Sequence, residues 1–272
     1  NSYLYVLLGM FFSLIFLVFP AHESAKRGGV PWYDIVLFVL TLLITGYFAY
    51  FGLTSLEEGW EYDSPDFPVY LAFIMWAMIM EGARRTGGWA IFFVFGILSL
   101  YPVYAGSDFM PSMFSGSPET LFNTARYHLM SEESVLGIPL RVFGTLIIGF
   151  ILFGVTLQST GGGRFFINLA FALLGGVRGG PAKVAIVASG LFGSLSGSVI
   201  TNVLTTGAMT IPAMKRTGYP PTYAGGIEAC ASTGGVLMPP VMGATAFVMA
   251  SFLDIPYIWV AIAAIVLSLI HI

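Results

Sequence analysis

The chain has 272 residues, of which 57% are hydrophobic and only 9% are charged, and its formal net charge is −3. Soluble domains carry about 25% charged residues, so this composition excludes an ordinary soluble protein and predicts an all-α integral membrane protein. The small net charge, without a basic run, argues against a nucleic-acid partner. The single cysteine, Cys230, excludes an intrachain disulfide and a cysteine-based zinc site.

Hydrophobic runs in the first part of the chain predict four membrane-spanning helices, at residues 3–19, 35–53, 67–81 and 89–104. Basic residues in short loops mark the cytoplasmic side, and here they are Lys26, Arg27, Arg84 and Arg85. The acidic loop 57–66 then lies outside. The polar segment 107–135 is predicted to be an external loop carrying a short surface helix, and residues 137–158 to cross back inward.

The apolar run 165–174 is too short to cross a hydrocarbon core of about 30 Å at about 1.5 Å per residue. Glycines bracket this run, and basic residues flank it at Arg164, Arg178 and Lys183. This pattern predicts a short helix at 164–176 that lies along the cytoplasmic interface. Such a helix could connect a fixed part of the protein to a moving part.

Residues 184–214 carry no charge and lie between Lys183 and the pair Lys215 and Arg216. The rule for basic residues places all three of these side chains on the cytoplasmic side. Two full spans need about 40 residues plus a turn, and a single span would place its ends on opposite sides. We therefore expect a re-entrant hairpin with arms at 184–195 and 199–214. A single long tilted helix is the alternative.

The following segment, 219–253, is predicted to cross outward as a broken helix. Its two apolar pieces, 224–233 and 242–253, are separated by Pro239 and Pro240, and proline removes a backbone donor and disfavours helix just before it. Inside a membrane the backbone leaves its helix only where protein or a cavity satisfies it. Two breaks so close together predict a binding site at membrane depth. A last span begins at Tyr257.

The two breaks offer neutral hydroxyl and carbonyl oxygens, which suit Na⁺ better than Mg²⁺ or Ca²⁺, because those ions recruit carboxylates. The helix N-terminus near Ser198 would attract a carboxylate substrate. Alternatively, the glycines and serines serve helix packing alone. Glu228 is the only charge between Arg216 and Asp254, and it is either a functional carboxylate or one hydrogen-bonded between helices. No catalytic triad, metal set or phosphate loop is present, so we expect no enzyme and no resident cofactor.

Several of these segments resemble a known family. SGSVITN, TTGAMTIPAMKRTGY and ASTGGVLMPPVMGA are similar to the large-subunit signature of tripartite ATP-independent periplasmic (TRAP) transporters. FFINLAFALLGGVRGGPAKVA and EGARRTGGWA resemble the fused permeases of the TAXI branch, in which small and large membrane subunits form one chain. The likeness is strong from Gly137 onward and weak before Glu81.

The resemblance implies an elevator-type secondary transporter of the bacterial or archaeal cytoplasmic membrane, driven by a Na⁺ gradient. A periplasmic binding protein would deliver a small organic anion. Residues 1–85 would be the small-subunit-like part without its first helix. Residues 86–272 would be the first half of an inverted repeat, so we expect that this piece alone does not transport.

The candidate site residues follow from the two breaks and from the resemblance. The candidate Na⁺ ligands are Ser194, Ser196, Gly197, Asn202, Thr233 and Gly234, and the candidate substrate contacts are Ser198, Thr201, Ser232 and Pro239. Two alternative functions stay open. One is an elevator transporter for di- or tricarboxylates that needs no binding protein, and the other is a membrane subunit that does not transport.

Overall fold

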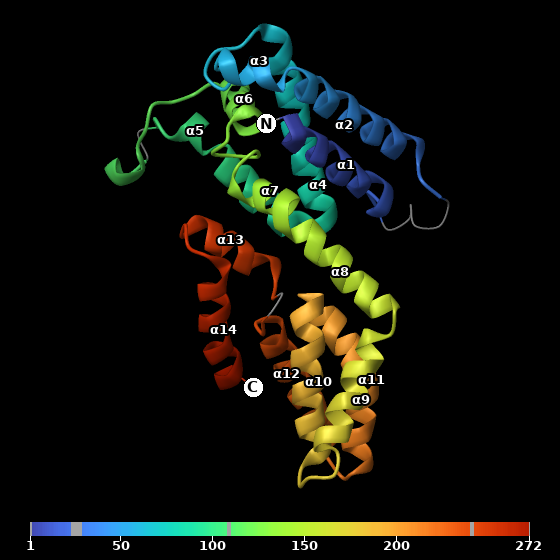
Figure 1. Ribbon diagram of the computed structural model, residues 1–272. Coiled ribbons are helices and arrows are strands. Elements are labelled where there is room, and N and C mark those ends of the chain that lie inside the picture. The colour runs from blue at the N-terminus through green and yellow to red at the C-terminus, as the bar shows by residue number, and fades with distance from the viewer. Residues whose placement is uncertain (1, 23–28, 108–109, 240–241, 272) are drawn as a thin grey trace. The chain divides into compact units, whose positions relative to one another are not determined.

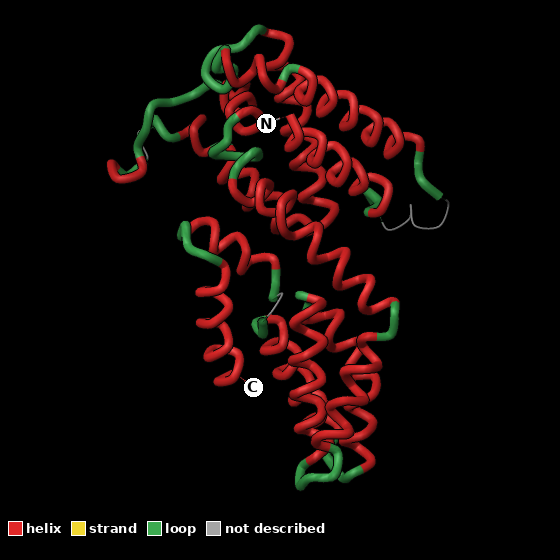
Figure 2. The backbone as a smooth tube through the Cα atoms, in the orientation of Figure 1, coloured by secondary structure: helices red, strands yellow, loops and turns green. Residues whose placement is uncertain are grey.

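The computed structural model describes residues 2–22, 29–107, 110–239 and 242–271; Lys26, Arg27 and Pro240 lie outside them. Every regular element in these ranges is helical (Figure 2), which confirms the predicted all-α fold. The elements are α1 (Ser2–Val18), α2 (Trp32–Tyr50), α3 (Gly52–Glu57), α4 (Asp66–Ser99), α5 (Tyr101–Tyr104), η2 (Ser112–Phe114), α6 (Leu121–Met130), α7 (Ile138–Val142), η3 (Phe143–Ile147), α8 (Ile148–Ser159), α9 (Gly162–Leu174), α10 (Gly180–Ser196), α11 (Val199–Arg216), α12 (Pro221–Val236), α13 (Ala244–Phe252) and α14 (Tyr257–His271). The chain divides into two compact units, Asn1–Arg141 and Val142–Ile272.

The first unit is organised around α1, α2, α4 and α6 (Figure 1). Tyr5 and Phe48 stack at 5.4 Å in its core, and the Tyr5 hydroxyl donates to the Leu129 carbonyl at 3.3 Å. A Cβ at Gly9 would lie 2.4 Å from Thr45 Oγ1, so α1 and α2 approach closely only because residue 9 has no side chain.

Helix α4 contains a sharp reversal at Gly88, whose φ of 75° and ψ of −174° are not helical. A straight helix would hold Met80 and Gly96 about 24 Å apart. Instead, Met80 Cε lies 3.3 Å from the position that a Cβ at Gly96 would take. The two halves of α4 therefore fold back on each other, as expected for the separate spans 67–81 and 89–104.

The helix predicted in the polar segment 107–135 is α6. Thr120 caps it by accepting a hydrogen bond from the Asn123 N–H at 3.2 Å. Ala125 and Leu129 are each only 1% exposed, and α6 packs against α4. One face of α6 is therefore buried, because small and apolar residues spaced by four face α4, while Leu121 and Phe122 are exposed.

The predicted span 137–158 is helical as α7, η3 and α8, and the second unit begins within it, at Val142. By length and composition, three helical stretches among the described residues could cross a membrane: Trp32–Tyr50, Asp66–Ser99 and Ile138–Ser159. Helix α9 follows and packs Ile167 and Ala170 against α10, while Phe165 and Leu173 are exposed. It therefore has the two faces expected of an interfacial helix, and its role as a connecting arm stays a prediction.

Helices α10 and α11 form the predicted helical hairpin. They are joined by Gly197, whose φ is 60°, and by Ser198, whose side chain accepts from the Thr201 N–H at 3.3 Å. The contact of 3.1 Å between the Ser189 and Thr206 hydroxyls shows that the two arms run side by side in opposite directions. A single long helix over 184–214 is therefore wrong.

The predicted broken helix is present as α12 and α13. The break follows Val236, whose carbonyl accepts a hydrogen bond from the Gly243 N–H at 3.1 Å. Within the break, Met242 has a φ of 60°, a region that non-glycine residues rarely occupy. The sequence therefore located the interruptions at the hairpin tip and between α12 and α13.

Candidate functional site: the hairpin tip, the helix break and a buried carboxylate

The tip of the α10–α11 hairpin lies against the break between α12 and α13. The Met242 N–H donates to the Ser194 carbonyl at 3.2 Å. A Cβ at Gly197 would lie 3.0 Å from the Met242 carbonyl oxygen, and the φ of Gly197 also favours glycine. The two interruptions that are far apart in the sequence are therefore in direct backbone contact.

The hydroxyls of the tip make local hydrogen bonds. Ser194 Oγ donates to the Leu191 carbonyl at 2.9 Å, and Ser196 Oγ lies 3.4 Å from both the N–H and the carbonyl oxygen of Ser198. Because these bonds join neighbouring residues, the hydroxyls can turn to a ligand without breaking a contact between helices. Thr201, the remaining predicted contact here, is half-buried in the first turn of α11.

Asn202 lies below the tip and joins three helices. It is fully buried, and its Nδ2 donates to the Ser189 carbonyl at 2.9 Å and to the Ser232 carbonyl at 3.4 Å. Its Oδ1 accepts from the Thr206 hydroxyl at 3.3 Å. Asn202 therefore fixes the hairpin against α12, while it is also a predicted ion ligand.

Glu228 is the centre of a polar network inside the same three helices. Its side chain is fully buried, and four hydroxyls lie within hydrogen-bond distance of its carboxyl oxygens. The partners are Ser189 at 2.9 Å, Thr206 at 2.5 Å and Ser232 at 3.2 Å on Oε1, and Thr210 at 2.5 Å on Oε2. Three hydroxyls therefore surround the two lone pairs of Oε1, and one hydroxyl lies against Oε2.

Three members of this network, Ser189, Thr206 and Thr210, were not among the predicted site residues. A signal for two of them exists in the sequence, because Asn202, Thr206 and Thr210 recur every four residues and must share one face of α11. The partner face on α12 carries Glu228 and Ser232 with the same spacing. Ser189 has no comparable signal, because its role depends on the antiparallel pairing of α10 with α11.

Glycines allow the three helices to come this close. A Cβ at Gly235 would lie 2.3 Å from the Ser189 carbonyl oxygen, and one at Gly193 would lie 2.6 Å from Asn202 Nδ2. A Cβ at Gly207 would lie 3.1 Å from Glu228 Cγ. These glycines therefore have the packing role that was the alternative reading, and the polar network lies in the space that they leave.

The predicted residues on the broken helix are distributed between different surroundings. Ser232 belongs to the Glu228 network, whereas Thr233 is exposed and donates to the Ala229 carbonyl of its own helix at 2.8 Å. The Gly234 carbonyl accepts from Ser268 Oγ at 3.0 Å, and Pro239 is half-buried in the break. The structure thus brings Ser232 to the hairpin but places Thr233 away from the buried network.

A cavity of about 210 Å³ adjoins the tip within the second unit. Its walls come from η3, α8, the tip and the break, and its polar residues are Gln158 and Ser196. A Cβ at Gly154 would lie 2.8 Å from the Leu195 carbonyl oxygen, so α8 also approaches the tip through a glycine. This small cavity could admit water or part of a ligand to the tip.

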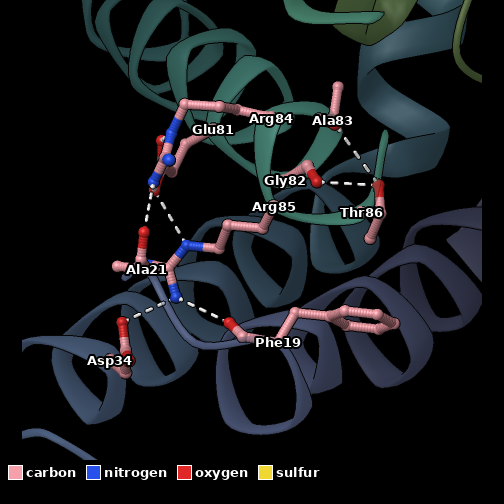
Figure 3. A network of polar contacts seen from close by, with 9 residues as sticks. All are labelled: Phe19, Ala21, Asp34, Glu81, Gly82, Ala83, Arg84, Arg85 and Thr86. Atoms are coloured by element: carbon pink, nitrogen blue, oxygen red, sulfur yellow. Dashed lines mark hydrogen bonds and ion pairs between the residues drawn. The ribbon is translucent and has the colours of Figure 1, made fainter. Parts of the chain in front are cut away.

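The first unit contains a buried carboxylate of a different kind (Figure 3). Asp34 pairs with Arg85 at 2.7 Å, and the two side chains are only 1% and 2% exposed. Arg85 also contacts Glu81 at 2.8 Å and the Phe19 carbonyl at 3.2 Å, and Glu81 holds Arg84 at 2.7 Å. This network balances two carboxylates with two guanidinium groups and joins α2 and α4 to the chain just beyond α1.

Comparisons with known proteins agree with the resemblance to TRAP transporters. A family model described as "Tripartite ATP-independent periplasmic transporter, DctM component" matches residues 74–272. The C4-dicarboxylate TRAP transporter large permease protein DctM of Pseudomonas aeruginosa is 39% identical over 119 residues, which cover 41% of this chain and 28% of that protein. The sialic acid TRAP transporter permease protein SiaT of Haemophilus influenzae is 32% identical over 174 residues, which cover 63% of this chain and 24% of that protein.

A further relative is the isethionate TRAP transporter permease protein DctMQ of Oleidesulfovibrio alaskensis, 38% identical over 91 residues that cover 34% of this chain and 14% of the relative. The chain spans less than a third of the length of each of these relatives. No solved structure matches it significantly.

Proposed function

Because the chain belongs to the family of TRAP transporter DctM components, a family of transporters rather than enzymes, we propose that it is part of a permease that takes up a small organic anion together with Na⁺. The observation that carries this proposal is the contact between the hairpin tip and the helix break, made by the Met242 N–H and the Ser194 carbonyl at 3.2 Å. Two interrupted helices that meet in this way supply a site from backbone groups and short polar side chains.

The ligands available at the tip favour sodium over a divalent ion. Ser194, Ser196 and Asn202 offer neutral oxygens, and the described residues contain no group of three or more His, Cys, Asp or Glu side chains that could hold a metal ion. Neutral oxygens can replace the hydration shell of Na⁺, whereas Mg²⁺ and Ca²⁺ usually recruit carboxylates. Sodium is therefore the proposed coupling ion.

The proposed substrate is an organic anion delivered by a periplasmic binding protein. The relatives are named for C4-dicarboxylates, sialic acid and isethionate, all of which carry an acid group. The N-terminus of α11 at Ser198 lies at the tip, and its partial positive charge favours an anion. Ser198, Thr201, Ser232 and Pro239 are the proposed substrate contacts. We propose that the binding protein selects the substrate.

The family match also supports a fused architecture in the cytoplasmic membrane. The match begins at residue 74, so α1, α2 and α3 lie before it, where a small-subunit-like part is proposed. The proposed boundary at residue 85 differs from the division of the compact units at Arg141. We propose the TAXI type, the re-entrant position of the α10–α11 hairpin and an elevator movement with α9 as its arm.

Uptake measurements test this proposal. The chain would be placed in a complete permease, reconstituted in proteoliposomes with its binding protein, and uptake of candidate organic acids compared in Na⁺ and K⁺ gradients. We expect uptake only when Na⁺ and the binding protein are both present. Uptake should fall at least tenfold in Ser196→Ala and in Asn202→Ala. Ser159→Ala, which changes an exposed serine, is the matched control. Sodium-independent uptake would falsify the coupling. Uptake without a binding protein would favour the alternative of a di- or tricarboxylate transporter. Unchanged uptake in both variants would favour the alternative that this chain is a membrane subunit that does not itself transport.

A further inference from the structure

The buried carboxyl of Glu228 has polar partners but no cationic one. In the described parts of the three helices around it, the basic residues are Lys183 on α10 and Lys215 and Arg216 on α11, and all three are exposed at the ends of the helices away from the tip. On α9, which packs against α10, Arg164 is exposed too. Among the residues that the structure describes, no ion pair or hydrogen bond joins a basic side chain to Glu228.

The hydroxyl partners of Glu228 can donate hydrogen bonds to its carboxyl group. A carboxylate only accepts hydrogen bonds. Ser189 and Ser232 can donate to it, and Thr206 and Thr210 can do so in place of their bonds to the backbone carbonyls of Asn202 and Thr206. Hydrogen bonds to an ionised acceptor are about twice as strong as neutral ones. They offset part of the cost of burying a charge, which is high in an apolar interior when no opposite charge is near.

The missing opposite charge can be supplied at the hairpin tip. Ser189 precedes Gly197 by eight residues on α10, and Thr206 follows Ser198 by eight residues on α11. At about 1.5 Å per residue, the carboxyl network lies about 12 Å from the tip along both helix axes. At an effective dielectric constant of about 20, a unit charge at this distance changes the affinity for a monovalent cation about tenfold.

We propose that Glu228 supplies the negative charge that holds the coupling cation at the tip, which is otherwise built from neutral oxygens. Glu228 does not touch the ion, and its charge acts through space. It also acts through Asn202, because the Thr206 hydroxyl lies within hydrogen-bond distance of both the Asn202 and the Glu228 side chains. Cation binding in turn stabilises the buried charge, because the coupling between two sites is reciprocal. This inference rests on the proposed function, since it requires a Na⁺ site at the tip.

The test compares half-saturating Na⁺ for uptake by the complete permease in three variants. Glu228→Gln keeps the shape and removes the charge, and we expect its half-saturating Na⁺ to rise about tenfold while uptake at saturating Na⁺ stays within about twofold. Glu228→Asp keeps the charge and should stay within about threefold of the wild type. Asp254→Asn is the matched control, because it removes an exposed carboxylate from the same unit and should change nothing.

A second variant separates charge from packing. Thr210→Val removes one hydroxyl from the network but keeps the carboxylate, so it should lower thermal stability and leave half-saturating Na⁺ within about twofold. Unchanged half-saturation in Glu228→Gln, or a tenfold rise in Glu228→Asp or Thr210→Val, overturns the proposal. If Glu228→Gln does not fold, the other two variants decide the question by the same limits. Wild-type uptake without Na⁺ dependence would instead be a failure of the proposed function.

Discussion

Each of the two units buries a carboxylate, but the two carboxylates are compensated in different ways. Asp34 in the first unit pairs with Arg85, which also binds Glu81 (Figure 3). Glu228 in the second unit is surrounded by hydroxyls from α10, α11 and α12, and no basic side chain pairs with it in the described structure. The first network pairs its carboxylates with guanidinium groups, whereas the second surrounds its carboxyl with hydroxyls.

This difference separates a structural role from a binding role. A closed ion pair fixes the positions of α2 and α4 and gains nothing from a ligand. A buried charge without a partner costs free energy until an ion arrives, so it can be kept for its effect on ion binding. The comparison therefore assigns the fixed framework to the first network and the proposed ion chemistry to the second.

Removing the partner of Asp34 should have the largest effect on stability. Arg85→Met leaves a carboxylate that is only 1% exposed without its cation, and breaking a buried pair from one side costs about 3–5 kcal/mol. The free energy of unfolding, measured in detergent with chemical denaturant, should fall by this amount.

The double variant Asp34→Asn with Arg85→Met is the control for this prediction. It removes both charges, so it should recover a large part of the loss in Arg85→Met. A loss below about 1 kcal/mol in the single variant would show that the pair is not buried as described, and the contrast with Glu228 would no longer hold.

A smaller effect is expected where a glycine lets the helices of the second network approach. In Gly235→Ala the new Cβ would lie 2.3 Å from the Ser189 carbonyl oxygen, and overpacking of this kind costs about 1–3 kcal/mol. Gly226→Ala on the same helix meets nothing within 4 Å and should be neutral or stabilising by up to about 1 kcal/mol. Thermal unfolding of both variants measures the difference, and equal midpoints would contradict the close packing of α10 against α12.

The sequence predicted the fold well where a local pattern decides it. The breaks at Gly197 and around Pro239 were found because small residues and proline interrupt uncharged, apolar sequence. The count of residues between Lys183 and Lys215 favoured a hairpin over a single long helix. The reversal within α4 followed from two apolar runs around the Arg84 and Arg85 pair. The buried face of α6 was missed, because it depends on which helix packs there.

The candidate site was predicted less completely, because side-chain partners depend on pairing between helices. Glu228 and Asn202 were identified, but their hydroxyl partners Ser189 and Thr210 are far apart in sequence and meet only in the three-helix bundle. The exposure of Thr233 depends on the rotation of α12 about its axis, and an apolar sequence with polar residues at 228, 232 and 233 does not fix that rotation.

The most direct test of the account is the effect of Na⁺ on the thermal unfolding midpoint of the purified chain, with K⁺ at equal ionic strength as reference. A ligand that binds the folded state raises this midpoint by an amount that grows with the ratio of ligand concentration to dissociation constant. We predict a Na⁺-specific increase in the wild type and in the double variant Asp34→Asn with Arg85→Met, and a much smaller one in Glu228→Gln. Equal midpoints in Na⁺ and K⁺ for the wild type, or an undiminished increase in Glu228→Gln, would contradict the account.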